Sequence, residues 1–153
     1  SGPTIYKGTD EYKYIEVTKK GIVHYKGVPF NGSVTETYEN GQLKLKGSYK
    51  DGEYDGYWTL FYKNGQLWIG KYFEDATEEG LWESFYSNGQ LSIRTNYRKG
   101  KLDGLWEEFY KNGQLERRRH FKDGKIHGLS EAFYKDGRLE LREVYKDGHP
   151  ILE

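Results

Sequence analysis

Tyr38-Glu39-Asn40-Gly41-Gln42-Leu43 is the strongest indication of the fold, because its pattern returns along the chain every 24 residues. The copies begin at Tyr62, Tyr86, Tyr110 and Tyr134, and no residue is inserted or lost between them. An Asn-Gly pair between alternating apolar residues is typical of a tight turn joining two antiparallel strands, since both residues tolerate a positive φ. The sequence therefore predicts tandem β-hairpins, each with a two-residue type I′ turn at this pair.

A second pattern keeps the same period and falls between the copies of the first. It runs from Tyr49-Lys50-Asp51-Gly52 to Gly56 and Trp58, and it returns around Trp106. The copy in between has Ala76 where the others have the turn glycine. The glycines of the chain thus recur with the turns, which argues against a phosphate-binding glycine-rich loop.

The predicted register of the hairpins can be tested on the charged residues. A turn centred on Asn88-Gly89 places Tyr86 opposite Leu91, and the strands continue outward from there. The same register opposes three pairs of unlike charge: Glu83 with Arg94, Glu107 with Arg118 and Glu131 with Arg142. Each such cross-strand pair stabilises a sheet by roughly 0.2–1 kcal/mol. Three in succession favour this register.

Alternation along the strands sorts the side chains onto two faces, because successive residues of a strand point to opposite sides. The face with Trp82, Ile93 and Tyr97 is the more apolar one. One hairpin is only marginally stable alone, so we expect the units to stack edge to edge. The expected fold is all-β: an elongated single antiparallel sheet of about five tandem 24-residue β-hairpin repeats with a degenerate N-terminal cap.

The beginning of the chain departs from the repeat. Residues 1–24 are interpreted as a tag remnant at Ser1-Gly2-Pro3 followed by capping strands, since Tyr12–Val17 alternates like a strand and terminal repeats are usually atypical. Residues 25–153 are assigned to the tandem hairpin repeats. No charged or apolar leader segment is present at the start. The sequence leaves the compartment open between the cytoplasm and export after removal of a leader.

Composition excludes several kinds of chemistry. The 24 basic residues equal the 24 acidic ones, whereas nucleic-acid binding needs a surplus of positive charge, so no nucleic-acid partner is expected. The chain has no cysteine, and its four histidines are scattered, so we expect neither a metal nor a cofactor. His127 is interpreted as a turn cap. The glutamates of the three charged pairs repeat with the hairpins and already face arginines, so no enzyme is expected.

The fourth unit carries the departure that points to a partner. It opposes Glu108 to Arg117 where neighbouring units have mostly apolar pairs, and it places Trp106 opposite Arg119. Arginine over a tryptophan ring forms a cation-π contact, and this composition is typical of interface hot spots. The alternative interpretation is that the charged pair keeps an exposed face soluble and that the tryptophans join adjacent hairpins. The candidate partner-binding residues are Trp58, Lys71, Trp82, Trp106, Glu108, Arg117 and Arg119.

The combined pattern, Tyr-x-Asn-Gly-x-Leu followed by Tyr-x-Asp-Gly-x-x-x-Gly-x-Trp, resembles the bacterial variant of the MORN (membrane occupation and recognition nexus) repeat from Tyr25 to Gly148. The resemblance implies antiparallel hairpins in an elongated curved sheet that acts as a scaffold or protein-binding module. Phospholipid binding is proposed for some members, and some bacterial members are antitoxins or immunity proteins. The sequence departs from the pattern at Ala76, at Ser130 in the tryptophan position, and at Thr37 where later units have phenylalanine.

We therefore expect a non-enzymatic protein-binding repeat module. The resemblance implies, more concretely, a bacterial immunity or antitoxin-type protein that binds and neutralises a toxin or effector. The alternative is a membrane-surface or envelope scaffold or adaptor that binds anionic phospholipid or glycan. Neutral overall charge counts against the lipid alternative, because acidic residues cancel the attraction of basic ones to headgroups.

Overall fold

The computed structural model describes residues 2–152 and consists almost wholly of β-strands. The one helix in this part of the chain is a 3₁₀ turn, η1 (Asp10–Tyr14). The chain divides into two compact units, Ser1–Thr77 and Glu78–Glu153, which are taken separately below. Ser1, the first residue of the expected tag remnant, lies outside the described residues. The predicted all-β class is confirmed.

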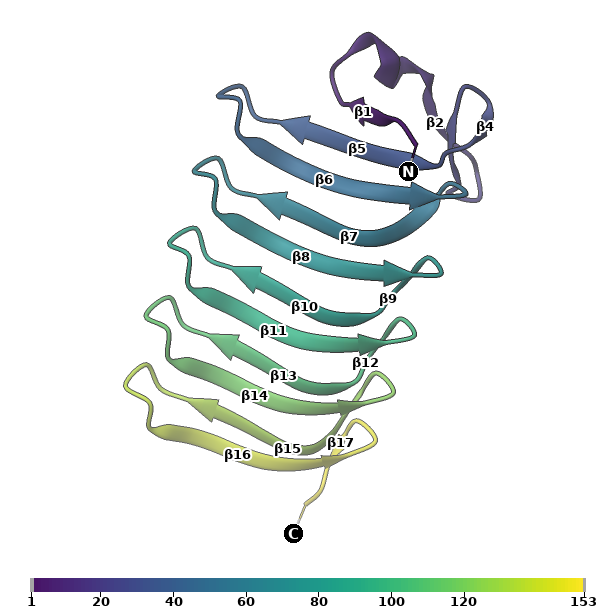
Figure 1. Cartoon of the computed structure of the whole chain (residues 1–153). Coiled ribbons are helices and arrows are strands. Elements are labelled where there is room, and N and C mark those ends of the chain that lie inside the picture. The colour runs from purple at the N-terminus through teal and green to yellow at the C-terminus, as the bar shows by residue number, and fades with distance from the viewer. Residues whose placement is uncertain (1, 153) are drawn as a thin grey trace. The chain divides into compact units, whose positions relative to one another are not determined.

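The first unit holds two hairpins of the repeat. Their strands are β5 (Gly32–Thr37), β6 (Leu43–Lys50), β7 (Glu53–Phe61) and β8 (Leu67–Glu74). These strands pair antiparallel in chain order (Figure 1). β1 (Thr4–Tyr6) pairs in parallel with β5, and the short β9 (Thr77–Glu78) pairs with β8. The parallel strand is an exception to the antiparallel pairing that the repeat predicts.

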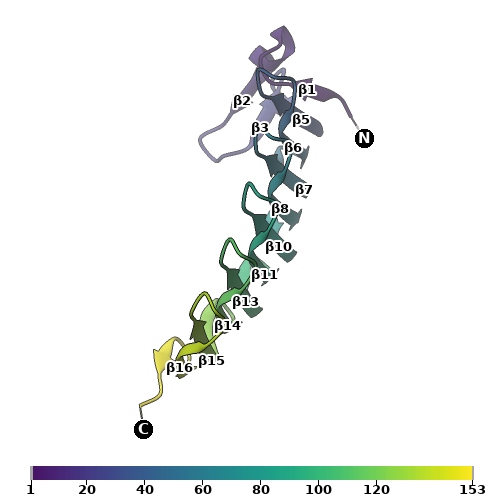
Figure 2. The ribbon, with the colours of Figure 1, turned by 90° about the vertical axis from the view of Figure 1, so that its left-hand side faces the viewer.

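A small separate sheet forms an N-terminal cap on the first unit. It contains β2 (Ile15–Val17), β3 (Val23–Tyr25) and β4 (Val28–Pro29) and follows η1 directly. Figure 2 shows β2 and β3 on one side of β5 and β6. The strand predicted over Tyr12–Val17 is wrong in its first half. The 3₁₀ turn instead lets Tyr12 pack against the core, while Tyr14 meets Tyr25 edge-on with 6.3 Å between ring centroids.

The second unit holds three hairpins of the repeat. They pair β10 (Gly80–Phe85) with β11 (Leu91–Arg98), β13 (Gly104–Phe109) with β14 (Leu115–Lys122), and β15 (Lys125–Phe133) with β16 (Leu139–Lys146). The two-residue β12 (Lys101–Leu102) pairs with β11, and β17 (His149–Pro150) pairs with β16. The predicted count of five tandem hairpins is therefore confirmed over the described residues.

The register predicted from the charges is confirmed away from the loops. The predicted pairing of Tyr86 with Leu91 is wrong, because Phe85 lies opposite Leu91 and a bulge next to Ser84 restores the predicted register. The three unlike pairs lie opposite each other as expected: Glu83 with Arg94, Glu107 with Arg118 and Glu131 with Arg142. Trp106 lies opposite Arg119, and Glu108 lies opposite Arg117. A slip of one residue would have moved every side chain to the other face. The assignment of residues to faces therefore holds for these pairs, up to the bulge beside each loop.

The turn type predicted at Asn-Gly is wrong. The N–H of Tyr86 donates to the carbonyl of Gln90 at 2.8 Å, and the N–H of Gly89 donates to the carbonyl of Tyr86 at 2.9 Å, so the loop has three residues. Gly89 has a φ of +90°, whereas Asn88 has no positive φ. The Oδ1 of Asn88 accepts the N–H of Gln90 at 2.9 Å. The asparagine thus closes the loop through its side chain, and a type I turn followed by a left-handed glycine results.

Two-residue type I′ turns form instead at the second pattern. Asp51 and Gly52 both have positive φ, 51° and 79°, and Lys50 pairs with Glu53 across the turn. Asp75 and Ala76 have the same conformation in the next turn of this unit, although Ala76 is not a glycine and has a φ of 64°. The left-handed region brings the Cβ of an L-residue too close to its own carbonyl, at a cost of roughly 1–2 kcal/mol.

Replacing Ala76 by glycine is expected to raise the free energy of unfolding. The gain should be about 0.5–1 kcal/mol, because relief of the left-handed strain outweighs the extra freedom of glycine in the unfolded chain. Urea denaturation followed by tryptophan fluorescence measures it. Gly100→Ala, at the equivalent turn position of the second unit with a φ of 81°, is the reverse control and should destabilise. A loss of stability in Ala76→Gly would contradict the strain argument.

The tyrosine and asparagine of the first pattern join each loop to the next repeat. In the second unit, the hydroxyl of Tyr86 donates to the carbonyl of Phe109 at 2.6 Å, and the Nδ2 of Asn88 donates to the carbonyl of Lys111 at 3.2 Å. The last copy has Asp136 in place of the asparagine, and its carboxylate accepts from the Nε of Arg138 at 2.7 Å. The first pattern is therefore structural: it fixes the spacing of successive hairpins.

Candidate functional site

The candidate residues of the second unit lie on one face of its sheet, which we call the tryptophan face. Trp82 lies opposite Thr95, and Trp106 lies opposite Arg119. The rings of Trp82 and Trp106 meet edge to face, with 5.5 Å between centroids and an interplanar angle of 68°. Phe121 continues the row at 6.0 Å from Trp106. Both tryptophans are half-buried, so the row has packed and solvent-facing parts.

Two polar residues help to fix the row of rings. The hydroxyl of Thr95, only 2% exposed, donates to the carbonyl of Leu105 at 3.1 Å. Tyr97 packs on Trp82 with 6.0 Å between ring centroids. Burial, with a smaller contribution from the negative charge of Glu78, raises the pKa of the Tyr97 hydroxyl to about 12. Tyr97 is therefore neutral at physiological pH and acts as a packing residue, not as a base.

The charged residues of the tryptophan face are not arranged as predicted, with Arg119 stacked over the ring of Trp106. The Nε1 of Trp106 donates to the carboxylate of Glu108 at 2.8 Å. Glu108 lies between Ile93 on β11 and Arg117 on β14. Arg119 forms no cation-π contact with Trp106 within residues 2–152, and its Nε is buried without a hydrogen-bond partner there. The predicted cation-π contact is therefore wrong.

In the first unit the equivalent face is covered. Trp58 lies opposite Lys71, as predicted, but its side chain is only 8% exposed. Its Nε1 donates to the carbonyl of Ser48 at 3.1 Å. A Cβ added at Gly47 would lie 2.1 Å from the indole, so only glycine allows the ring to lie against β6 at this point. Trp58 is a core residue, and a partner could reach it only by displacing the cap.

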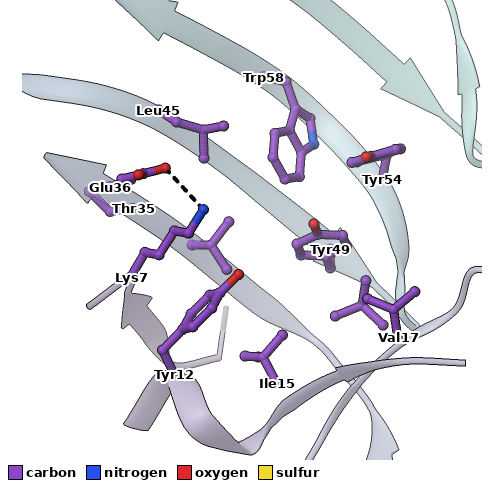
Figure 3. A pocket seen from close by; sticks show the side chains of 12 residues that line it. Lys7, Tyr12, Ile15, Val17, Thr35, Glu36, Leu45, Tyr49, Tyr54 and Trp58 are labelled. Atoms are coloured by element: carbon purple, nitrogen blue, oxygen red, sulfur yellow. Dashed lines mark ion pairs between the residues drawn. The ribbon is translucent and has the colours of Figure 1, made fainter. Parts of the chain in front are cut away.

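The cap leaves a cavity of about 210 Å³ over this face, and no pattern in the sequence predicts it. Its apolar lining combines residues of the cap with residues of the sheet: Tyr12, Ile15, Val17, Val23, Val34, Leu45, Tyr49, Tyr54 and Trp58 (Figure 3). The Nζ of Lys7 lies 3.6 Å from the carboxylate of Glu36 at its rim. Burial raises the pKa of the Tyr49 hydroxyl to about 12, so this group also stays neutral.

The opposite face of the second unit carries the charged pairs. The carboxylate of Glu131, 4% exposed, lies 3.0 Å from an Nη of Arg118 and 2.9 Å from an Nη of Arg142. Hydrogen bonds from Arg142 lower the pKa of Glu131, against the effect of burial and together with Arg118. Arg118 is thus ion-paired with Glu131 and not with Glu107, which lies opposite it.

A carboxylate held by two guanidinium groups is ionised and fully occupied, so Glu131 has no free acid or base function.

His127, interpreted above as a turn cap, accepts a hydrogen bond from the backbone N–H of Asp147, with 3.4 Å between Asp147 N and His127 Nδ1. Among residues 2–152, no group of three or more histidine, aspartate or glutamate side chains is placed to hold a metal ion. In the same range, no helix has the length and apolar character to cross a membrane.

Comparison with known protein families gives four consecutive matches to one family, which is described as a MORN repeat variant. The matched residues are 30–51, 54–75, 78–99 and 102–123. They start 24 residues apart, in agreement with the period of the sequence, and together cover more than half of the 153-residue chain. No curated protein matches the chain.

Proposed function

The chain belongs to the MORN repeat variant family, and from this premise we propose that it is a non-enzymatic protein-binding module whose tryptophan face in the second unit docks a partner protein. The observation that carries the proposal is the contact between Trp82 and Trp106, together with the bond from Trp106 to Glu108 and the position of Arg119 opposite Trp106. Tryptophan and arginine are enriched at interface hot spots, and tryptophan buries much surface at little entropic cost.

The regular sheet supports this role physically. The residues of the face lie on β10, β11, β13 and β14, whose hydrogen-bonded register fixes their positions before a partner arrives. Preorganised side chains lose less freedom on binding than side chains of a mobile loop. Trp58 has no such role, because it lies under the cap.

The finer proposal is that the partner is a toxin or effector and that the protein is of the bacterial immunity or antitoxin type. It rests on the resemblance of the repeat to proteins of that kind. An immunity protein acts by covering a surface of its target, which requires contact area and no chemistry of its own. A face of aromatic and paired charged side chains suits that task.

Affinity capture at about 0.3 M salt, which screens exposed charges strongly, tests the docking face. The double variant Trp106→Ala, Arg119→Ala is expected to weaken partner binding by at least about thirtyfold, because a hot-spot truncation costs 2 kcal/mol or more. The matched control is Leu105→Ala, His120→Ala, whose residues are also opposed to each other but lie on the other face of the same two strands. The control should retain the partner, and equal retention by both variants would contradict the docking face.

The alternative partner is an anionic membrane surface or a glycan. Arg94 and Arg118 are already ion-paired, and Arg117 lies on the opposite face from both. These basic residues therefore do not form one surface for headgroups. Vesicles that contain phosphatidylserine separate the two candidates. Binding that disappears between low salt and about 0.3 M salt indicates lipid, whereas a desolvated protein interface survives that change.

A further inference from the structure

The cavity between the cap and the sheet of the first unit has no part in the proposed docking face. Its walls come from two parts of the same unit, since Ile15 and Val17 belong to the cap whereas Leu45 lies on β6. Val17 is 66% exposed and Tyr54 is 47% exposed, so the cavity is open to solvent where these two residues line it. A small molecule can therefore enter it.

The size and the lining of the cavity favour a single aromatic ring. An apolar cavity of about 150 Å³ holds a benzene molecule, and this cavity measures about 210 Å³. The difference leaves room for a few further atoms attached to one ring. Three aromatic side chains line the cavity from the sheet, those of Tyr49, Tyr54 and Trp58. A flat ring can add edge-to-face contacts to them, and such contacts stabilise beyond the burial of area.

Two hydroxyl groups of the lining have no partner in the described chain. Figure 3 shows Tyr12, from the cap, and Tyr49, from the sheet, on opposite sides of the cavity. Within residues 2–152 neither hydroxyl forms a hydrogen bond. Neither oxygen is among the fully buried polar atoms of that range that lack a partner, so both are accessible. A ligand with a hydrogen-bond acceptor would give these donors the partner that they lack.

The rim of the cavity carries a positive charge. The carboxylate of Glu36 lies 3.6 Å from the Nζ of Lys7 and 3.5 Å from the Nζ of Lys44. Two ammonium groups on one carboxylate leave one net positive charge at this rim. Lys7 itself lines the cavity, and its Nζ lies 5.9 Å from the centre of the Tyr12 ring. The rim therefore favours an anionic ligand over a cationic one.

We propose that this cavity binds a small aromatic carboxylate, a single ring that carries its acid group on a short aliphatic arm. The ring lies among the apolar side chains beside Trp58, and the carboxylate lies at the rim near Lys7. A cation, the usual guest of aromatic cages, fits less well, because Lys7 repels it. Tyr49 and Tyr54 also stack on each other, with 5.6 Å between ring centroids and an interplanar angle of 24°. The site shares no residue with the tryptophan face and does not depend on it.

Calorimetric titration of the whole chain with phenylacetate tests the proposal. We expect saturable binding with a Kd below about 1 mM. Phenylacetamide has the same shape without the charge, and phenethylammonium has the opposite charge, so each should bind at least about threefold more weakly. Phenylacetate should also shift the nuclear magnetic resonance signal of the Trp58 indole N–H. Absence of binding, equal binding of the three compounds, or shifts confined to the second unit overturn the proposal.

Two variants locate the polar end of the ligand. Lys7→Met keeps the apolar part of the side chain and should weaken phenylacetate at least about threefold while leaving phenylacetamide unchanged. Tyr49→Phe keeps the ring and should weaken phenylacetate about threefold by removing one donor. The matched control is Lys46→Met, because Lys46 follows Leu45 on β6 and alternation directs its side chain to the other face. Unchanged affinity in both Lys7→Met and Tyr49→Phe, or an equal loss in Lys46→Met, overturns the proposal.

Discussion

Trp58→Ala is expected to lower the free energy of unfolding by about 3–5 kcal/mol, the range measured for large aromatic residues in protein cores. The indole meets Tyr49 and Tyr54 edge to face, with 5.0 and 4.8 Å between ring centroids. It also joins the core cluster that contains Ile5 and Phe30. Its loss leaves a void next to the existing cavity, and the carbonyl of Ser48 loses its donor. Urea denaturation measures the change.

Trp68→Ala is the matched control for this prediction. Trp68 lies on β8 of the same unit, is 39% exposed, and has one ring neighbour, Tyr62, at 5.7 Å. Its truncation should cost clearly less than that of Trp58, since a much larger part of its surface is already exposed. Similar losses for the two variants would show that the cap does not seal Trp58 as described.

Glu131→Gln is expected to lower the free energy of unfolding by about 1–2 kcal/mol at neutral pH. The carboxylate accepts charge-assisted hydrogen bonds from Arg118 and Arg142, and these contribute more than neutral ones. We place the effect below that of a fully buried ion pair, because the two arginine side chains are 38% and 58% exposed and are screened by solvent. Glutamine retains the shape and one acceptor but not the charge.

The pH dependence gives the sharper test. The pKa of Glu131 is lowered in the folded chain, first by Arg142. The contribution of the Glu131 carboxylate to the free energy of unfolding is therefore fully present above the pKa of an unfolded glutamate, about 4.3. This contribution is lost as the pH falls through the pKa of Glu131 in the folded chain. The difference between wild type and Glu131→Gln should be largest at neutral pH and should shrink below about pH 4.

Glu107→Gln is the matched control, because Glu107 occupies the same column one repeat earlier and forms no ion pair within the described residues. Its effect should be small at every pH. A difference for Glu131→Gln that does not change with pH would attribute the loss to packing and not to the charge.

The tandem array could be predicted because its determinants are local and repeated. The fixed period, the turn residues and the unlike charges at opposed positions can all be recognised in the amino-acid sequence alone. The register that opposes Trp106 to Arg119 follows from them, and so does the sharing of a face by Trp82 and Trp106. The turn at Asn88 could not be predicted correctly, because the choice between two and three residues depends on a side-chain hydrogen bond and on the next repeat.

Contacts between residues close along the chain establish the repeat, the class of fold, the register of the hairpins away from their loops and the faces, so these features could be predicted. Which part of a face is covered depends on contacts between distant segments. The cap packs onto Trp58 through the buried cluster that includes Ile5 and Val23. These segments lie far apart in the sequence, and the repeat pattern does not predict contacts between them. The same applies to the cavity beneath the cap, because it depends on which elements lie next to each other in space.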